Sequence, residues 1–417
     1  MKILAIDTSC DDTCIAILEI GKQPFGESAR RRPGKLEIKS NIISSQVKIH
    51  RKYGGVYPTL AKREHQRNLL PVLIRALKGN KLLKISNSKI QTLKKILERE
   101  EYLGEELEKF LKKYQKPKVD AIAVTVGPGL EPCLWVGINF ARSLSHYWDL
   151  PIVPVNHIEA HILANFLNTK YKIQNTKYLF PAVCLVVSGG HTQLILMKNF
   201  GQYKILGETR DDAAGECFDK TARILGLSYP GGPAIAAEAA RLKIKDYRFQ
   251  IKLPRPMINS KNYDFSFSGL KTAVLYKIKD YKPVASLPVI SSKLRKLKIK
   301  DKNYIRAMCA EIQQAIIDVL IKKTIKATKD YKAKTIILGG GVAANTELRK
   351  QFKTTCLTPD VKRATSGVKL LIPAKNLCTD NAAMVGVAAY YHGLKGKTKA
   401  GRDIEANANL RISQNDQ

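Results

Sequence analysis

Two hydrophobic patterns alternate along this chain. Short apolar runs such as residues 2–7 (KILAID) and 13–20 (TCIAILEI) are typical of strands, and the polar turn TSCDD between them predicts a hairpin. Residues 311–328 (EIQQAIIDVLIKKTIKAT) place apolar side chains three and four positions apart, as an amphipathic helix does. Strands and helices that alternate, with glycines at the strand ends, predict an α/β fold whose ligands bind at the carboxyl ends of the strands.

The first third of the chain predicts a strand-rich lobe with a helical insertion. A basic stretch after the hairpin is expected to be irregular, YGGVYP marks a turn, and Thr59 is a candidate N-cap for the next helix. Residues 80–117 are rich in Lys and Glu at helical spacing, so we expect an inserted helical excursion there. Residues 119–130 (VDAIAVTVGPGL) predict a strand that ends in a Gly-Pro-Gly turn, followed by a helix.

The second part of the chain repeats this order of elements. Residues 178–198 predict a strand, a Gly-Gly turn and another strand, which is the same order of elements as in the opening hairpin. Residues 211–227 predict a helix capped by Asp211 or Asp212. A strand, a Gly-rich turn and a helix follow at residues 335–350 (TIILGGGVAANTELRK), and NLCTDNAAMVGVAAYYHG opens a last helix. The repetition predicts two lobes of related architecture.

Length and composition agree with this division. The chain has 417 residues, more than one core usually supports, so we expect lobes at 1–150 and 151–395 and a polar tail at 396–417. The chain is 44% hydrophobic, with no run long enough to span a bilayer and no signal-peptide pattern in its first residues, so a cytoplasmic location is expected. The eight cysteines are scattered without a CxxC pair, which favours reduced, structural thiols.

Charge changes the picture of possible partners. The formal net charge is +35, and such a field attracts polyanions, with nucleic acid the leading candidate. Basic runs lie at residues 29–35, 293–302 and 361–369. Any single run is more simply a solvated surface loop than a specific phosphate site. Together the three runs still favour a polyanionic partner.

The stretch HIEAH at residues 157–161 is a candidate half of a metal site. His157 and His161 lie four positions apart, so on a helix their rings emerge on one face, close enough to share an ion. Glu159 lies two positions after the first His and points away from that face, unlike the Glu of the zinc-protease helix. Two half-exposed histidines without a ligand are an equally good interpretation of the spacing alone.

Four glycine-rich or polar turns follow predicted strands: DTSCDDT, VSGGH, YPGGP and LGGGVAAN. Exposed amides in such turns bind anions, although each turn alone is also explained as a tight connection. None matches a Walker P-loop or a dinucleotide fingerprint. Two facing hairpin turns with a third turn before a helix are typical of the two-lobed actin, Hsp70 and sugar-kinase superfamily, which binds a nucleotide in the cleft between its lobes.

At this level of detail the chain resembles a known family, the bacterial tRNA N(6)-adenosine threonylcarbamoyltransferases, once called O-sialoglycoprotein endopeptidases. The resemblance runs from residue 1 to about 393, outside insertions near 24–39, 80–117, 281–302 and 353–370. It rests on these motifs, in order: IDTSCDDT, SQVKIH with YGGVYP, GPGL, HIEAH, LVVSGGHTQL, DDAAGECFDKTARILGLSYPGGPAI, RPM with DFSFSGLKTA, GGGVAAN and CTDNAAM.

The resemblance implies a metal site and an adenylate site. In the family the two histidines and the Asp of the CTDN segment bind one metal, usually iron, which here implies His157, His161 and Asp380. Two imidazoles and a carboxylate also suit zinc. The adenylate-binding residues carry over to Val186, Val187, Ser188, Gly189, Gly190, Asp219, Gly232 and Asn345. The simpler alternatives are that Asp219 forms a salt bridge and that Asn345 caps its helix.

The chain departs from the family pattern at a few positions. Asp7 and Asp12 stand where many members have Glu, and Ala160 stands where Gly is frequent. Ala236 stands where many members have Asp, so one ligand contact is expected to be missing.

The activity implied is transfer of a threonylcarbamoyl group from its adenylate to the N(6) amine of the adenosine 3′-adjacent to the anticodon in tRNAs that read ANN codons, with release of AMP. We expect Asp11 to act as base or orienting carboxylate, although a turn Asp bonded to its own backbone is a rival interpretation. Lys271 is a weaker candidate for contact with phosphate. The family also implies a heterodimer with a paralogous protein and a small ATPase.

Three other activities are compatible with parts of the sequence. A kinase or ATPase of the same superfamily would share the turns but would not need the His-His-Asp set. A metalloprotease would need a water-activating carboxylate beside the histidines. A non-catalytic RNA-binding scaffold would explain only the charge.

Overall fold

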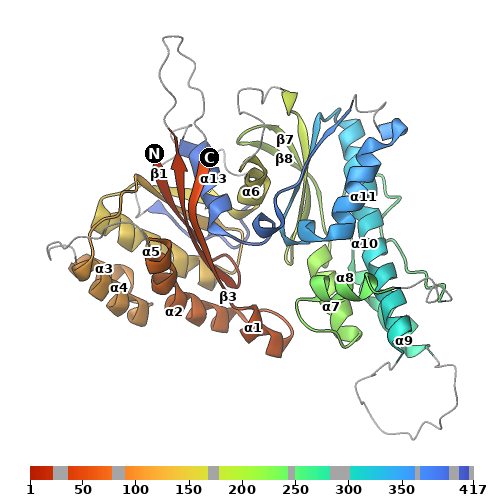
Figure 1. Cartoon of the computed structure of the whole chain (residues 1–417), viewed down its shortest axis with the longest axis horizontal. Coiled ribbons are helices and arrows are strands. Elements are labelled where there is room, and N and C mark those ends of the chain that lie inside the picture. Colours follow the sequence, from red (N-terminus) through yellow and green to blue (C-terminus); the bar gives the residue numbers. More distant parts are fainter. Residues whose placement is uncertain are drawn as a thin grey trace, which may run out of the picture.

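The computed structural model of the chain describes residues 1–21, 36–77, 90–167, 178–242, 249–281, 301–361, 367–393 and 403–412. These residues form two α/β lobes that lie side by side (Figure 1), each built on one five-stranded sheet. The predicted fold class, a two-lobed α/β architecture, is confirmed. In the described part of the chain, no helix is both long enough and apolar enough to cross a bilayer.

The two sheets have the same strand order. The first runs β3-β2-β1-β4-β5, and the second runs β8-β7-β6-β9-β10. In each, a meander of antiparallel strands is followed by strands added in parallel to the first one. The strands are β1 (Lys2–Asp7), β2 (Asp12–Ile20), β3 (Leu36–Ser45), β4 (Ala121–Gly127), β5 (Ile152–Asn156), β6 (Ala182–Val187), β7 (Thr192–Asn199), β8 (Gln202–Glu208), β9 (Thr335–Gly339) and β10 (Lys369–Leu371). The relation between the two halves that the turn pattern predicted is therefore real at the level of topology.

Helices cover both faces of each sheet, which explains why β1 and β4 are almost continuously apolar. In the first half of the chain these are α1 (Val47–His50), η1 (Arg51–Tyr53), α2 (Pro58–Ala76), α3 (Ile90–Ile96), α4 (Glu101–Lys113), α5 (Glu131–Trp148), α6 (His157–Leu163) and η2 (Ala164–Phe166). In the second half they are α7 (Ala214–Ile224), α8 (Gly231–Ala239), α9 (Ser268–Lys279), α10 (Lys302–Asp330), η5 (Gly341–Ala344), α11 (Thr346–Leu357), η6 (Lys375–Leu377) and α13 (Ala382–Gly393).

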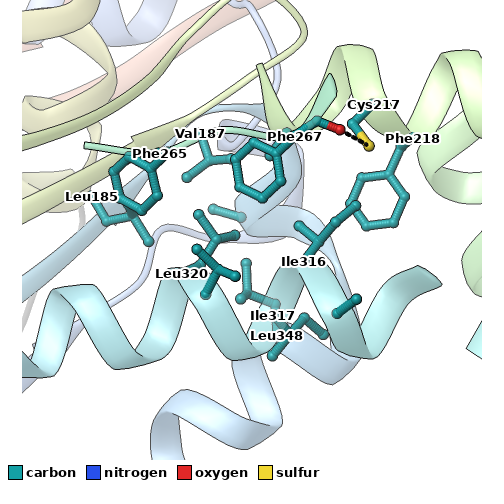
Figure 2. Close-up of a cluster of buried hydrophobic side chains, with 14 of the residues drawn as sticks. Leu185, Val187, Cys217, Phe218, Phe265, Phe267, Ile316, Ile317, Leu320 and Leu348 are labelled. Atoms are coloured by element: carbon teal, nitrogen blue, oxygen red, sulfur yellow. Dashed lines mark hydrogen bonds between the residues drawn. The ribbon is translucent and has the colours of Figure 1, made fainter. Parts of the chain in front are cut away.

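Three hydrophobic clusters hold these layers together. One lies between the first sheet and α2 to α5, and another between the second sheet and the helices of its lobe. Figure 2 shows part of the latter, where Phe265 and Phe267 pack over Ile316 and Leu320 of α10. Each such side chain contributes about 1.5–3 kcal/mol when fully buried. The third cluster contains α6 and α13 and joins residues of both sheets, so the two lobes share a core.

The boundary that we expected at residues 150/151 lies one strand short of the end of the first sheet. β5 pairs in parallel with β4 and completes that sheet, although it begins at Ile152. The last helix, α13, comes from the far end of the second lobe and packs on β1 and β2. The chain thus crosses between the lobes more than once, and α6 and α13 are the elements at the crossing.

The expected polar tail is wrong for residues 403–412. Ile404 and Ile412 are each only 2% exposed, and each belongs to one of the hydrophobic clusters. The Asn407 amide donates to the Val126 carbonyl, and Gly127, at φ 147°, leaves no room for a β-carbon against Asn407. Two isolated apolar residues in a polar stretch carry too little pattern to predict this docking.

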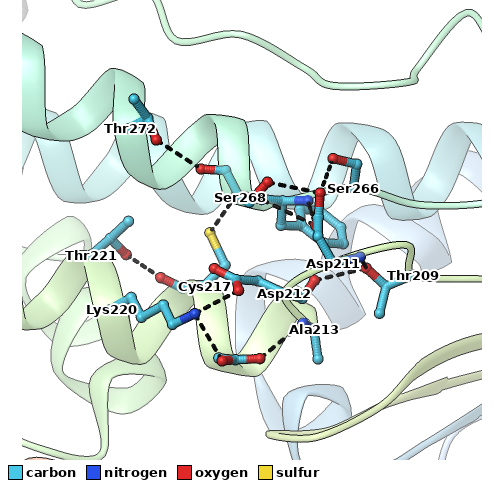
Figure 3. A network of polar contacts seen from close by, with 12 residues as sticks. Thr209, Asp211, Asp212, Ala213, Cys217, Lys220, Thr221, Ser266, Ser268 and Thr272 are labelled. Carbon is cyan, nitrogen blue, oxygen red and sulfur yellow. Dashed lines mark hydrogen bonds and ion pairs between the residues drawn. The ribbon is translucent and has the colours of Figure 1, made fainter.

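Three local predictions also need correction. Residues 36–45 form β3 rather than an irregular stretch, because an edge strand with a half-exposed face can be polar. The helix after YGGVYP begins at Pro58, whose fixed φ suits the first helical position, so Thr59 is not its cap. The helix starting at Ala214 has Ala213 at its N-cap position, and Asp211 instead accepts hydrogen bonds across the loop from the start of α9 (Figure 3).

The helical insertion is confirmed for the residues that the structure describes. α3 and α4 pack through Leu103, Leu107 and Leu111, which are buried at helical spacing. Residues 80–89 of the predicted excursion lie outside the described part of the chain, as do the basic run at 29–35 and most of the runs at 293–302 and 361–369.

Candidate functional site

A cavity of about 910 Å³ lies between the two lobes. Its lining comes from the turns that the sequence singled out: the β1–β2 turn, the Gly-Pro-Gly turn after β4, the β6–β7 turn, the start of α8 and the glycine-rich turn after β9. These segments meet because both sheets direct the ends of their central strands toward the cleft. His157 and Asp380 lie at the cavity wall.

The histidine pair is buried rather than half-exposed. His157 and His161 stand on one face of α6 with ring centroids 4.6 Å apart, and they are 6% and 1% exposed. The helix begins at a fixed point because Asn156 Oδ1 accepts hydrogen bonds from the Ile158 and Glu159 amides at 2.9 and 3.2 Å. The alternative of two half-exposed histidines is therefore wrong.

Asp380 comes from a distant part of the chain to meet these rings. Its Oδ1 lies 3.5 Å from His157 Nε2 and 3.2 Å from His161 Nε2. The three potential ligand atoms all lie within 4.8 Å of one another. The next residue, Asn381, caps the start of α13 through its Oδ1 and donates to the Thr379 carbonyl, which holds the Asp380 segment in place.

The electrostatics of this group depend on burial and on the close carboxylates. Burial alone lowers the pKa of His157, but Asp380 and Asp7 outweigh it and raise the pKa to about 9. Burial lowers the pKa of His161 below its ordinary value despite the contact with Asp380. Burial opposes ionisation of Asp380, yet the two imidazoles hold its pKa well below the usual range.

The donor set fits a divalent transition-metal ion. His161 Nδ1 is buried and makes no hydrogen bond to any described residue. His161 Nε2 and His157 Nδ1 make none of good geometry either, although they face Asp380 and Asp7 at 3.2 and 3.6 Å. A buried imidazole nitrogen without a partner is costly, and coordination of a metal by its lone pair removes that cost. Two imidazoles and one carboxylate, with room on the cavity side, suit iron(II) or zinc and leave positions open for an exogenous oxygen.

Glu159 does not belong to this group. It is 1% exposed, and Tyr203 donates its hydroxyl hydrogen to Glu159 Oε1 at 2.9 Å. The expectation that it points away from the histidine face is confirmed, and no water-activating carboxylate of the zinc-protease kind is supplied by α6.

The β6–β7 turn presents its glycines to the cavity. The Ser188 amide donates to the His191 carbonyl at 2.8 Å, and the His191 amide donates to Ser188 Oγ at 3.1 Å. This closed turn exposes Gly189 and Gly190, and a β-carbon on either would meet no atom within 4 Å. The backbone there is open to a close approach by a ligand.

Val186 and Val187 do not line the cavity, so their side chains do not contact a ligand bound there. They are fully buried on opposite faces of β6, one in each of two hydrophobic clusters. Their part is to hold the strand that carries the Ser188 turn.

The remaining predicted ligand residues lie on the second lobe. Asp219 of α7 and Gly232 of α8 line the cavity, and Asp219 Oδ1 accepts the Gly231 amide at 2.6 Å. Burial raises the pKa of Asp219 to about 6. Within the described residues Asp219 forms no salt bridge, so that alternative is wrong. Ala236 also lines the cavity, which places the missing carboxylate of the family pattern at this wall.

Asn345 lines the cavity but its side chain is already engaged. Its Oδ1 accepts the Leu348 amide at 3.0 Å and caps α11, and its Nδ2 donates to Gln313 Oε1 at 2.8 Å. The simpler interpretation, that Asn345 caps its helix, is correct. It sets the direction of the turn from Gly341 to Thr346, which borders the cavity.

Asp11 faces the same cavity from the first lobe. Its pKa is raised by burial and then by the negative charge of Asp380. The turn that carries it is held by His65 of α2, a residue that the sequence analysis missed. His65 Nε2 donates to the Cys10 carbonyl at 3.0 Å and Nδ1 accepts from the Thr13 hydroxyl at 2.8 Å.

Burial lowers the pKa of His65 to about 4, so the ring is neutral and its tautomer is set by these two partners. A single His on the apolar face of a helix has no sequence signal that separates this role from ordinary packing. His191, Arg223 and Tyr229 also line the cavity and were not predicted, whereas Lys271 of α9 does not line it.

Comparison with known proteins places these features in one family. Residues 37–92 and 99–387 match the family described as tRNA N6-adenosine threonylcarbamoyltransferase. The protein of that name from Syntrophomonas wolfei is 40% identical over 94% of this chain and 92% of its own length. The one from Thermomicrobium roseum is 40% identical over 98% of this chain and 96% of its own. A solved structure of HypF in a phosphate- and nucleotide-bound form covers 96% of this chain and 47% of that chain, with 12% identity and a TM-score of 0.45.

Proposed function

We propose, from the premise that this chain belongs to the tRNA N6-adenosine threonylcarbamoyltransferase family, that its interlobe cavity is where the threonylcarbamoyl group passes from its adenylate to tRNA. The chain is a transferase that acts on the N6 amine of a tRNA adenosine. The relatives do not favour an ATP-dependent kinase of the same fold.

The observation that carries the proposal is the convergence of His157, His161 and Asp380 at the wall of a cavity that is also lined by a glycine turn. A kinase has no need for this set of ligands beside its nucleotide. Transfer from a mixed anhydride requires that the oxygens of the substrate are bound and that its reactive carbonyl is held in a fixed position. A metal site beside a glycine turn supports that geometry.

We assign the metal ligands to His157, His161 and Asp380, with iron(II) as the first choice and zinc as the second. When bound, the ion supplies positive charge that anchors oxygens of the activated substrate. The fit rests on the buried imidazole nitrogens that lack well-formed hydrogen bonds and on the mixed nitrogen and oxygen donor set.

The adenylate is assigned to the second lobe. Gly189 and Gly190 leave the backbone accessible to the phosphate, and Asp219 has a second carboxylate oxygen available for a ribose hydroxyl. Val186, Val187 and Asn345 support this site by holding β6 and α11, and Gly232 opens space at the start of α8.

The adenosine amine is a weak nucleophile because its lone pair is delocalised into the purine. As its nitrogen bonds to the carbamoyl carbon, the carbon–oxygen bond to the phosphate breaks, AMP leaves, and the amine releases a proton. We assign Asp11 as the acceptor of that proton, since a carboxylate with a raised pKa is a better base. His65 keeps Asp11 in place through the Cys10 carbonyl.

The partners follow from the substrate and from the family resemblance. The anticodon loop is single-stranded, so its base can enter a cavity without the melting of a duplex. The +35 net charge supports binding of the surrounding phosphates. The resemblance supports a heterodimer with a paralogous protein of the same fold and a small ATPase.

The experiment that tests the function is mass spectrometry of nucleosides from tRNA incubated with this chain, the expected partner proteins and chemically prepared threonylcarbamoyl adenylate. We expect threonylcarbamoyladenosine and one equivalent of AMP. His157→Ala and Asp380→Ala should abolish the product while tRNA binding is retained. Release of ADP from ATP without modified adenosine would overturn the proposal, as would full activity of both variants.

A further inference from the structure

A pair of exposed tyrosines stands beside the mouth of the cavity. Tyr53 and Tyr57 are 61% and 56% exposed, among the most exposed large apolar side chains of the described residues. Their ring centroids lie 5.9 Å apart with an interplanar angle of 26°, so the two rings stack and together present an exposed aromatic face. The residues between them, Gly54 to Val56, line the cavity itself.

This aromatic face is held on a fixed loop. The Tyr57 amide donates to His50 Nδ1 at 3.3 Å, and the His50 ring is held by Gln46 at 3.0 Å. Two arginines tie the same loop to the other lobe: Arg51 donates to the Tyr229 carbonyl at 3.0 Å and Arg223 donates to the Gly54 carbonyl. A loop with its backbone bound at both ends loses little entropy when a ligand stacks on its side chains.

The segment that carries the face is positively charged. Residues 46–63 contain five Lys or Arg residues and no Asp or Glu. Lys48, Lys52 and Arg63 are exposed, and none of them pairs with a carboxylate in the described part of the chain. Aromatic rings flanked by unpaired cations are the surface that single-stranded nucleic acids bind, with bases stacked on the rings and phosphates on the cations.

We propose that Tyr53 and Tyr57 form a stacking platform for a nucleobase of the tRNA anticodon loop next to the modified adenosine. The platform positions the loop while the target base enters the cavity, and Lys48 and Lys52 contact the adjacent phosphates. This inference rests on the proposed function and names a part of its tRNA site. A protein partner is the competing occupant, and the absence of acidic residues from 46–63 together with the unpaired cations favours RNA.

The first test measures binding of an RNA hairpin with the anticodon-loop sequence to the full chain by fluorescence anisotropy. Tyr57→Ala and the Tyr53→Ala, Tyr57→Ala double variant should weaken binding by about 5- to 100-fold per stacked base, whereas Tyr57→Phe should bind as the wild type does. The matched control is Tyr102→Ala, which removes an equally exposed tyrosine from α4 and should change nothing. Circular dichroism melting checks that each variant is folded.

Salt and base deletion separate stacking from charge. Tyr57→Ala should leave the slope of log affinity against log salt unchanged, while Lys52→Ala should reduce it by about one. Two further hairpins each carry one abasic nucleotide, either just before or just after the target adenosine. The hairpin that lacks the stacking base should bind wild type and Tyr57→Ala equally well. The platform is wrong if Tyr57→Ala loses the same affinity, relative to wild type, for every hairpin. It is also wrong if Tyr57→Ala binds the intact hairpin as tightly as wild type does.

The outcome for the reaction distinguishes this inference from the function itself. In the nucleoside assay Tyr57→Ala should raise KM for tRNA, leave KM for threonylcarbamoyl adenylate unchanged, and reach the wild-type product yield at saturating tRNA. If the wild type makes no product, the proposed function fails. If the variant binds RNA normally but loses a partner protein in size-exclusion chromatography, the face belongs to a protein interface and the platform is wrong.

Discussion

At the scale of single residues, the site depends on side chains that are unfavourable unless something else completes them. A bound cation would relieve two unfavourable features of the site: buried imidazole nitrogens that lack well-formed hydrogen bonds, and the cluster of carboxylates at Asp7, Asp11, Asp12 and Asp380. The functional residues are thus recognised by the unfavourable free energy of their burial, which a core selected only for stability would avoid.

The first residue-scale prediction concerns the metal. His157→Ala and Asp380→Ala should each weaken iron(II) and zinc binding by more than about 100-fold, since even changes behind the ligands cost 10- to 100-fold. The measurement is metal content after dialysis, by inductively coupled plasma mass spectrometry. Glu159→Gln, on the same helix but bonded to Tyr203, serves as the control and should keep the metal. Loss of metal in the control alone would contradict the assignment.

The second residue-scale prediction concerns pH. Burial raises the pKa of Asp12 from 3.8 to about 7, so folding favours its neutral form. That preference stabilises the protein fully below pH 3.8 and is lost as the pH rises through 7, because the unfolded chain ionises first. Asp12→Asn should therefore raise the free energy of unfolding of the metal-free protein by about 2 kcal/mol at pH 8 and by much less at pH 4.5. Urea unfolding at both pH values checks this.

The exposed Asp360 provides the control for this measurement, because Asp360→Asn removes the same charge without relieving burial. It should change stability little at either pH. A gain for Asp12→Asn that is equal at pH 4.5 and pH 8 would contradict the mechanism.

At the scale of elements, the site is made by turns and helix starts that approach one another closely. Gly215, at the start of α7, lies against the Ser188 turn so tightly that a β-carbon would come within 2.5 Å of the Ser188 carbonyl oxygen. Gly340, at φ 85°, fits against Val187 in the same way. The glycines in the sequence therefore serve two distinct purposes, contact between elements and access for ligand.

Gly215 and Gly189 separate these purposes. Gly215→Ala should lower the free energy of unfolding by about 1–3 kcal/mol through overpacking, and should also disturb adenylate binding. Gly189→Ala meets open space, so it should leave stability unchanged and weaken only the binding of the adenylate. Thermal melting and isothermal titration with a non-hydrolysable adenylate analogue measure the two effects. A stability loss for Gly189→Ala would contradict this division.

At the scale of the whole molecule, two sheets of the same topology are joined by α6 and α13 on one side of the cavity and by arginine contacts at its rim. The shared core makes the first junction permanent. The rim contacts are hydrogen bonds to backbone carbonyls, each worth about 1.5–3 kcal/mol at most, so they can open and close.

Removal of these rim contacts should loosen the cleft without unfolding the lobes. We expect Arg51→Ala combined with Arg223→Ala to speed amide exchange around residues 54–57 and 229–232, while exchange in β1 and β6 stays slow. Hydrogen–deuterium exchange with mass spectrometry is the measurement. Arg241→Ala, which removes an exposed arginine paired with Glu238, is the control and should alter neither region. Faster exchange in the central strands would show general destabilisation instead.

The sequence by itself determined most of the central strands, most helices and the turns that border the cavity, because hydrophobic periodicity and glycine positions are local properties. It missed the edge strand β3, which is polar. It also singled out His157, His161 and Asp380 through the family resemblance. Only the tertiary structure decided that the histidines are buried, that Asp380 meets them, and that Asn345 caps its helix while Val186 and Val187 hold a strand. Only the tertiary structure shows that residues 403–412 pack on the first lobe and that His65 holds the turn of Asp11 through the Cys10 carbonyl. These features depend on contacts between residues far apart in the chain. Such contacts produce no local pattern in the sequence around either residue, so they cannot be predicted from periodicity.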